Sequence, residues 1–170
     1  ILDEPALAAG KEYFRLGALS VSPDGRYLAY AIDDNGSERF EARVKDLTTG
    51  ELLPDTIPGM LSEIVWTADD SGFLYGLANK EWRTDNARFH RLGTDPAEDV
   101  LLHEEADPGM WTGFEGVAYR TQLLIGVGNS EVSETLVVDL PEDPAAPLPA
   151  PRVLIPRAWR MLADVEPITD

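Results

Sequence analysis

Short apolar runs alternate with turn residues along the chain, a pattern that predicts β-strands joined by tight turns. Three hairpins repeat this pattern, with turns at 23–25, 67–72 and 120–121. In the first turn, Pro23 fixes one backbone angle and Gly25 permits a conformation that other residues rarely adopt. The flanking strands are expected at 19–22, 63–66 and 116–119 before the turns, and at 26–31, 73–78 and 122–128 after them.

Each hairpin continues into a third and a fourth apolar run, so the chain contains three weak copies of one unit. The third strands are expected at 42–47, 88–92 and 136–140, and the fourth at 52–53, 100–102 and 153–155. The closing leucines of the third strands, Leu47, Leu92 and Leu140, are 45 and then 48 residues apart. Four strands at a period in the mid-forties is typical of a β-propeller blade.

The second strands favour a propeller over a small β-sandwich that binds carbohydrate or protein. A half-exposed strand alternates apolar and polar residues, whereas the runs 27–31, 73–78 and 123–127 are apolar on both faces. Such strands lie between two neighbouring sheets. The third strand of the first copy does alternate, with Phe40, Ala42 and Val44 set against charged neighbours, so we expect the third strands to lie nearer the solvent.

We therefore predict an all-β chain of about three four-stranded antiparallel blades. The expected divisions are a lead-in at 1–15, blades at 16–58, 59–110 and 111–158, and the start of a fourth blade at 159–170. A short helix is expected between Asp3, as its cap, and Gly10, just past its end. Five prolines within 141–151 suggest either an interdomain linker or a long surface connection. We favour the connection, because an apolar strand follows it in step with the earlier copies.

Composition excludes several classes of function. The formal net charge is −17, from 14 Lys and Arg against 31 Asp and Glu, which argues against nucleic-acid or membrane partners. No run of 18 apolar residues is present, and no cysteine is available for disulfides. We expect no export signal. A cytoplasmic location is favoured, with the periplasm open. The first residue is Ile1, so we expect the sequence to be a piece of a longer protein.

No catalytic or metal-binding motif emerges from the residues. The nearest approach to a Gly-x-Ser-x-Gly nucleophile elbow, Gly128-Asn129-Ser130-Glu131-Val132, lacks the second glycine and is better explained as a hairpin loop. A calcium-binding loop carries carboxylates at its first and twelfth positions. When Gly36 is aligned with the sixth position of such a loop, alanines occupy both of those positions. The acidic run 33–38 is therefore expected to be a solvated turn. The Asn35-Gly36-Ser37 glycosylation sequon is more simply a hairpin turn.

The remaining candidate residues also have simple structural interpretations. His90 and His103 are 13 residues apart with no cysteine to join them, so we expect surface or interface histidines rather than a zinc site. Glu104 and Glu105 are expected on opposite faces of a solvated edge strand. The four tryptophans are expected to pack between sheets rather than stack ligands; they are Trp66, Trp82, Trp111 and Trp159. We expect no catalytic residue, no metal and no cofactor in this chain.

Several segments together resemble a known family. They are 2–4, 9–17, 22–25, 44–50, 65–66, 91–101 and 104–107, including the runs Gly10-Lys11-Glu12-Tyr13-Phe14-Arg15-Leu16-Gly17 and Arg91-Leu92-Gly93-Thr94-Asp95-Pro96. These runs are similar to the start of the propeller domain of oligopeptidase B-like serine peptidases, in the prolyl oligopeptidase family. Ser22-Pro23-Asp24-Gly25 alone is shared by many propellers, whereas the opening run combined with Leu92-Gly93-Thr94 is more specific.

The resemblance implies a seven-bladed propeller that covers an α/β-hydrolase domain and gates the access of short peptides, with cleavage after Lys or Arg. The catalytic Ser, Asp and His of that family lie in the hydrolase domain, and no position here matches them. The implied partners are that hydrolase domain and short peptides. A stand-alone propeller for protein binding is the alternative. Because three blades cannot close a ring, we expect exposed faces at 27–31 and 123–127 and self-association of the isolated chain.

Overall fold

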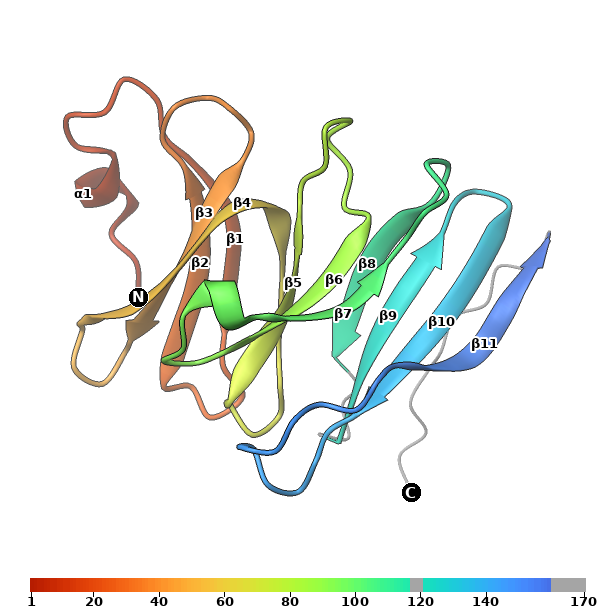
Figure 1. The fold of residues 1–170 in the computed structure, drawn as a ribbon. Coiled ribbons are helices and arrows are strands. Elements are labelled where there is room, and N and C mark those ends of the chain that lie inside the picture. The colour runs from red at the N-terminus through yellow and green to blue at the C-terminus, as the bar shows by residue number, and fades with distance from the viewer. Residues whose placement is uncertain (117–120, 160–170) are drawn as a thin grey trace.

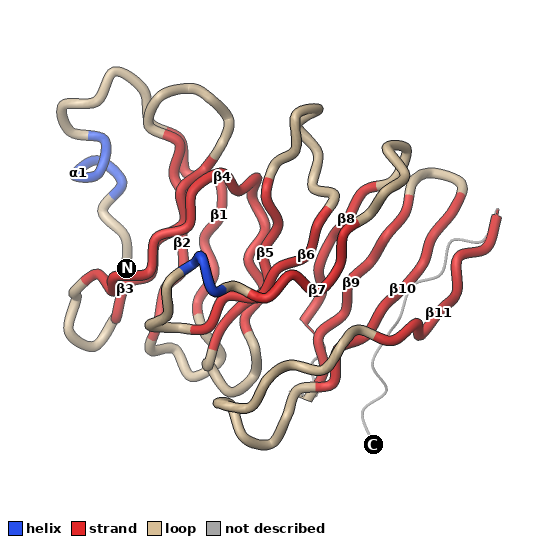
Figure 2. Tube along the Cα trace, in the orientation of Figure 1, coloured by secondary structure: helices blue, strands red, loops and turns tan. Residues whose placement is uncertain are grey.

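A computed structural model describes residues 1–116 and 121–159, and these residues are almost entirely β-structure (Figures 1 and 2). The strands are β1 (Arg15–Val21), β2 (Tyr27–Asp33), β3 (Phe40–Asp46), β4 (Leu52–Trp66), β5 (Gly72–Leu77), β6 (Asn86–Arg91), β7 (Val100–Glu104), β8 (Trp111–Gly116), β9 (Gln122–Gly128), β10 (Val132–Asp139) and β11 (Arg152–Trp159). Two short helices accompany them, α1 (Glu4–Ala8) and the 3-10 turn η1 (Pro96–Glu98). The all-β prediction is confirmed.

The strands form two antiparallel sheets, which match a partial β-propeller. A seven-stranded sheet runs in the order β1 to β7, and a four-stranded sheet runs in the order β11-β10-β9-β8. Figure 1 shows the strands following one another across the molecule as a curved series. The expected strand order within each copy is therefore found, with each strand beside the next along the chain.

The long strand β4 joins two elements that the sequence pattern separates. Its first part pairs with β3 and its last part with β5, and Met60 pairs with both Phe40 and Leu77. The expected strands at 52–53 and 63–66 are therefore the two ends of one strand. The sequence pattern does not predict one continuous strand here, because proline is disfavoured within a sheet and this segment contains Pro54 and Pro58. Proline is found at irregularities, such as the register shifts of β4. The expected boundary at 58/59 falls inside β4, and the division into blades stays a prediction.

The expected hairpin turns are present where the structure describes them. At the first turn, the Gly25 N–H donates to the Ser22 carbonyl over 2.8 Å, and Gly25 has φ of 78°. At the second, the Thr67 N–H donates to the Gly72 carbonyl over 2.9 Å. In the third copy, the strand that pairs with β9 is β8, which ends at Gly116. The rest of the strand expected at 116–119, and Arg120 of its turn, lie outside the described residues.

The second strands of the first two copies are buried on both faces, as predicted. Every residue from Leu28 to Ile32 is at most 3% exposed, and in β5 the same is true of Phe73, Leu74 and Tyr75. Alternate residues of these strands contribute to different apolar clusters, one on each side of the strand. β3 alternates between buried and half-buried residues, also as predicted. The core therefore consists of layers between successive four-stranded units.

The N-terminal segment covers a face that the sequence led us to expect exposed. Helix α1 is present, with the Asp3 carboxylate accepting a hydrogen bond from the Ala6 N–H over 3.0 Å. Apolar side chains before β1, among them Leu7 and Phe14, pack on the outer face of β2. The expected exposed face at 27–31 was therefore wrong, because the lead-in caps it. In β9, Leu123 to Ile125 and Val127 are at most 4% exposed, whereas Gly126 is exposed.

The proline-rich segment is a surface connection within the third copy, as favoured above. It joins β10 to β11 of one sheet, and it reaches back to the preceding unit, where the Arg91 guanidinium donates to the Ala146 carbonyl over 2.9 Å. Leu148 packs against the apolar cluster of β5, β6, β9 and β10. The expected fourth-blade start at 159–170 lies outside the described residues apart from Trp159. No helix in the described ranges is long and apolar enough to cross a membrane.

Candidate functional site

The loop that carries Ser130 is a hairpin loop, as predicted. It joins β9 to β10, and the Asn129 side-chain oxygen accepts hydrogen bonds from the backbone N–H groups of Glu131 and Val132 over 2.9 and 3.0 Å. In the acidic run 33–38, residues 34–38 form the turn between β2 and β3, as predicted, whereas Asp33 ends β2 and is buried, so a solvated position was wrong for it. Within the described ranges, no group of three His, Cys, Asp or Glu side chains is placed to hold a metal ion.

His90 lies in a completely buried network between the first two units. Its Nε2–H donates to Asp55 Oδ1 of β4 over 2.9 Å, and its Nδ1–H donates to Asp99 Oδ1 over 2.8 Å. The Gly93 N–H also donates to Asp55 Oδ1, over 2.6 Å, and the Tyr75 hydroxyl donates to Asp99 Oδ2 over 2.7 Å. The histidine is therefore an interface residue, one of the two alternatives expected for it.

The two carboxylates keep this imidazole charged. Burial by itself would lower the pKa of His90, but the hydrogen bonds and charges of Asp55 and Asp99 outweigh burial and raise the pKa to about 9. Burial opposes ionisation of Asp55 as well, yet the hydrogen bond from His90 brings its pKa below the usual value. The pKa of Tyr75 is raised by burial and by its bond to Asp99. The network is an ion cluster that ties β4 to β6.

One signal in the sequence points to this network. Leu53, Asp55 and Ile57 alternate along β4, so the carboxylate occupies a position where the pattern calls for an inward-facing apolar residue. A charged residue at such a position needs a buried partner. The sequence analysis expected His90 at the surface or at an interface, but it did not consider Asp55 or Asp99 as its partners.

A second ion cluster joins the second and third units. Arg157 of β11 pairs with Glu105 and with Glu134, the latter over 3.0 Å, and His103 Nε2 lies 3.7 Å from Glu105 Oε2. We expected Glu104 and Glu105 to lie on a solvated edge strand. Glu104 is exposed, but the Glu105 side chain is only 5% exposed, so this expectation is wrong for Glu105. Burial would raise the pKa of Glu105, but the hydrogen bond from Arg157 outweighs it and holds the pKa below its usual value.

The tryptophans divide into two kinds. Trp66 packs between sheets as predicted: it is 7% exposed, its indole N–H donates to the Ser20 carbonyl over 3.0 Å, and its ring lies against Phe73. Trp82 and Trp111 are 45% and 51% exposed, so packing between sheets was a wrong expectation for them. Trp82 lies in the β5–β6 loop, where no second sheet covers it. The side chain of Trp159 lies outside the described part of the structure.

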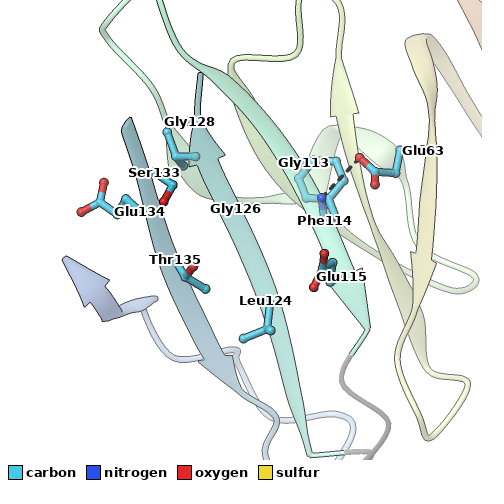
Figure 3. Close-up of a pocket in the computed structure, with 11 residues that line it drawn as sticks. Glu63, Gly113, Phe114, Glu115, Leu124, Gly126, Gly128, Ser133, Glu134 and Thr135 are labelled. Atoms are coloured by element: carbon cyan, nitrogen blue, oxygen red, sulfur yellow. Dashed lines mark hydrogen bonds between the residues drawn. The ribbon is translucent and has the colours of Figure 1, made fainter. Parts of the chain in front are cut away.

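An acidic hollow of about 290 Å³ lies on the third unit and beside β4 (Figure 3). Glu63, Glu115 and Glu134 are among its lining residues, and Gly113, Gly126 and Gly128 leave space along β8 and β9. The other lining residues are Phe114, Leu124, Val127, Ser133 and Thr135. None of these lining residues is basic.

One carboxylate of this hollow is anchored by the neighbouring strand. Glu63 accepts a hydrogen bond from the Phe114 N–H over 3.3 Å, drawn as the dashed line in Figure 3. Partial removal from water raises the pKa of Glu63, and the charge of Glu115 adds to this effect. Glu134 is already paired with Arg157. Glu63 and Glu115 are therefore the carboxylates of the hollow that suit attraction of a cationic group.

Comparison with known proteins places this geometry in context. The sequence model described as "Prolyl oligopeptidase, N-terminal beta-propeller domain" matches residues 1–167. The dipeptidyl aminopeptidase BI of Pseudoxanthomonas mexicana is 40% identical over 117 residues, which cover 67% of this chain and 16% of that protein. Protease 2 of Moraxella lacunata is 27% identical over 168 residues, covering 98% and 24%.

Among solved structures, oligopeptidase B from Leishmania major is similar to this chain. It superposes with a TM-score of 0.86 at 25% identity, over 98% of this chain and 23% of that one. The chain thus spans about a quarter or less of the length of each of these three proteins.

Proposed function

Because the chain belongs to the prolyl oligopeptidase family, as part of its N-terminal β-propeller domain, we propose that it is the non-catalytic gate of a serine oligopeptidase. In this proposal the chain admits short peptides to an α/β-hydrolase domain elsewhere in the parent protein. The match over residues 1–167 is the observation that carries the proposal. A ring of blades over a catalytic cleft would exclude folded substrates by size, and the hydrolase domain would supply the nucleophile, base and oxyanion hole.

The acidic character of the chain supports peptides with basic residues as substrates. The net charge of −17 favours encounter with cationic peptides, and the hollow of Figure 3 brings Glu63 and Glu115 to one place without a basic residue in its lining. We therefore propose that the parent protein hydrolyses peptide bonds after Lys or Arg. An electrostatic contribution of this kind weakens as salt screens the charges.

A second candidate reaction rests on the relative that is 40% identical, because its name describes release of dipeptides. In that case the group recognised would be the free amino terminus of the peptide, which is also cationic. The two reactions differ in whether blocking the amino terminus matters.

The test uses the parent protein that contains this chain. Fluorogenic peptides with Lys, Arg, Phe or Ala before the reporter are compared in kcat/KM, each with a free and an acetylated amino terminus, together with a folded protein substrate. The proposal expects cleavage after Lys and Arg regardless of acetylation and no cleavage of the folded protein. Loss of activity on acetylation would favour dipeptide release. Absence of hydrolysis of every peptide would favour a binding module, and efficient cleavage of the folded protein would contradict the gate.

A further inference from the structure

A second hollow, of about 360 Å³, opens between the first two units at the edge where the β2–β3 and β5–β6 loops project (upper edge in Figure 1). Its lining comes from β1, β3, β4 and these two loops and comprises Arg15, Leu16, Gly17, Glu38, Phe40, Leu61 and Trp82. Its volume lies within the range of about 300–1,000 Å³ typical of ligand sites. Its lining combines the apolar side chains of Leu16, Phe40, Leu61 and Trp82 with the charged side chains of Arg15 and Glu38.

Backbone strain is concentrated at this hollow. Glu38 and Trp82 have φ of 55° and 62°, and they are two of the three non-glycine residues with positive φ in the described ranges. A bulky aromatic residue rarely adopts this conformation. Strain of this kind persists only where the surroundings impose it, and it is frequent at binding sites.

The loop that carries Trp82 is held by Arg39 of the opposite loop. The Arg39 guanidinium donates to the carbonyls of Ala78 and Asn79 over 2.8 and 2.9 Å, and its central carbon lies 4.9 Å from the centre of the Trp82 ring. The Asn79 side-chain oxygen accepts hydrogen bonds from two further N–H groups of the same loop. One face of the indole is thereby fixed on a cation, and the side chain remains 45% exposed.

The loop that carries Glu38 is equally well fixed. The Asp33 carboxylate, which is buried, accepts hydrogen bonds from four successive backbone N–H groups, those of residues 35 to 38, over 2.7 to 3.3 Å. Burial would raise the pKa of Asp33, but these bonds outweigh it and lower the pKa. Both walls of the hollow are therefore organised before any ligand arrives, which reduces the entropy lost on binding.

The base and the rim of the hollow differ in character. Phe40 is 5% exposed, and its ring lies so close to Gly17 that a side chain there would overlap it. At the rim, Arg15 and Glu38 form a loose ion pair of 3.6 Å between side chains that are 55% and 64% exposed. Such a pair contributes little to stability, so a ligand can separate it at low cost.

We propose that this hollow is a subsite that holds an apolar side chain of a peptide bound to the propeller. The apolar side chain lies against Trp82, Phe40 and Leu61. Arg15, which only donates hydrogen bonds, matches a peptide carbonyl, and Glu38, which only accepts them, matches a peptide N–H. This inference rests on the proposed function in taking a peptide as the occupant, and it adds a preference for an apolar residue at one position of the substrate.

Direct binding to this chain is the first test. The probes are the blocked tripeptides acetyl-Ala-Phe-Ala-amide and acetyl-Ala-Ser-Ala-amide, titrated against the chain while backbone NMR signals are followed. The phenylalanine peptide is expected to bind at least tenfold more tightly and to shift the signals of the β2–β3 and β5–β6 loops. Equal binding of the two peptides, or shifts confined to other regions, would overturn the proposal.

The variant Trp82→Gly separates a binding role from a structural one. Glycine accepts the positive φ without strain, so the thermal unfolding midpoint is expected to stay or rise, while the preference for the phenylalanine peptide falls at least tenfold. The matched control is Trp111→Gly, another exposed tryptophan beside an arginine but outside the hollow, which should leave the preference unchanged. A large fall in the midpoint with an unchanged preference would show that Trp82 is structural and contradict the subsite.

A second readout, on the parent protein, distinguishes failure of the subsite from failure of the proposed function. Peptides that differ only in Phe or Ser at one position are compared in kcat/KM, with and without Trp82→Gly. Hydrolysis without any effect of Phe, Ser or Trp82→Gly would leave the peptidase proposal intact and overturn the subsite. Loop shifts with the phenylalanine peptide, but no hydrolysis by the parent protein, would support the subsite and contradict the peptidase. Shielding of Trp82 from a fluorescence quencher in the peptide-free parent would indicate a domain contact and overturn the subsite.

Discussion

The carboxylate of Asp55 and the imidazole of His90 lie 2.9 Å apart across the boundary between the first two four-stranded units, although 35 residues separate them in sequence. Neither side chain is more than 1% exposed. The Asp99 carboxylate accepts a hydrogen bond from the other ring nitrogen, so both nitrogens of the imidazolium donate to carboxylates. The apolar layer between these units is therefore supplemented by an ion cluster that joins β4 to β6.

Replacing the histidine should destabilise the chain strongly. His90→Gln removes the positive charge and leaves two buried carboxylates without their counter-ion, a change that costs about 3–5 kcal/mol of unfolding free energy in comparable sites. Urea denaturation of the chain measures this cost. The matched control is His103→Gln, because the His103 side chain is 20% exposed and contacts one carboxylate at 3.7 Å. Equal, small losses for the two variants would contradict a cluster that stabilises the fold.

The same cluster predicts a loss of stability at alkaline pH. The pKa of His90 is raised from 6.5 to about 9 on folding, so its contribution is complete below about pH 6.5 and is lost as the pH rises through about 9. The shift corresponds to about 3 kcal/mol. The charged groups that face His90 are Asp55 and Asp99. The Tyr75 hydroxyl bonds to Asp99, and the charge of Arg88 acts on Tyr75.

Other groups in the cluster act in different pH ranges. Because folding lowers the pKa of Asp55, the stability that Asp55 contributes is lost only as the pH falls into the acidic range. Because folding raises the pKa of Tyr75, the stability that Tyr75 contributes is lost only above about pH 10. Urea unfolding at several pH values between about 6 and 9 isolates the histidine contribution. In His90→Gln the slope over this range should disappear; an unchanged slope would assign it to other groups.

Gly72, at the start of β5, is predicted to tolerate no side chain. A Cβ there would overlap the backbone carbonyl of His90 and the ring of Phe89, and the carbonyl is fixed in the sheet. Gly72→Ala should lower the unfolding free energy by about 1–3 kcal/mol, as overpacking does elsewhere. Gly126→Ala is the control, because the nearest atom to its Cβ would be 4.0 Å away. Similar thermal midpoints for the two variants would show that β5 can shift at Gly72.

The N-terminal lead-in is predicted to limit self-association. Leu7 is one of the side chains that cover the outer face of β2, whereas Leu19 is already 49% exposed. Leu7→Ser should loosen the lead-in, expose Leu28, Tyr30 and Ile32, and increase association; Leu19→Ser should not. Sedimentation velocity across a salt series measures the effect, because salt screens the repulsion between acidic chains but does not weaken apolar burial. Equal sedimentation of both variants would contradict the capping role.

Some of this protein was determined by the sequence alone. The turn at Pro23-Asp24-Gly25 and the doubly apolar run 27–31 identify a hairpin buried on both faces, because backbone preferences and side-chain alternation depend on neighbours a few residues away. The period of the copies then predicts blades, and the N-terminal helix follows from its Asp3 cap. The turn, the buried strand and the capped helix are found in the structure because each is encoded within one short segment, whereas the division into blades stays a prediction.

Other features were decided only by tertiary structure. The continuity of β4 through Pro54 and Pro58 depends on partners supplied by β3 and β5, and the burial of His90 depends on Asp55 and Asp99 from other elements. Trp66 is buried and Trp82 exposed because one lies between sheets and the other on a loop. Ion pairs, and the burial of these histidine and tryptophan side chains, arise from contacts between segments distant in sequence, so local pattern cannot specify them. For that reason the sequence predicted the strands but did not predict the candidate sites.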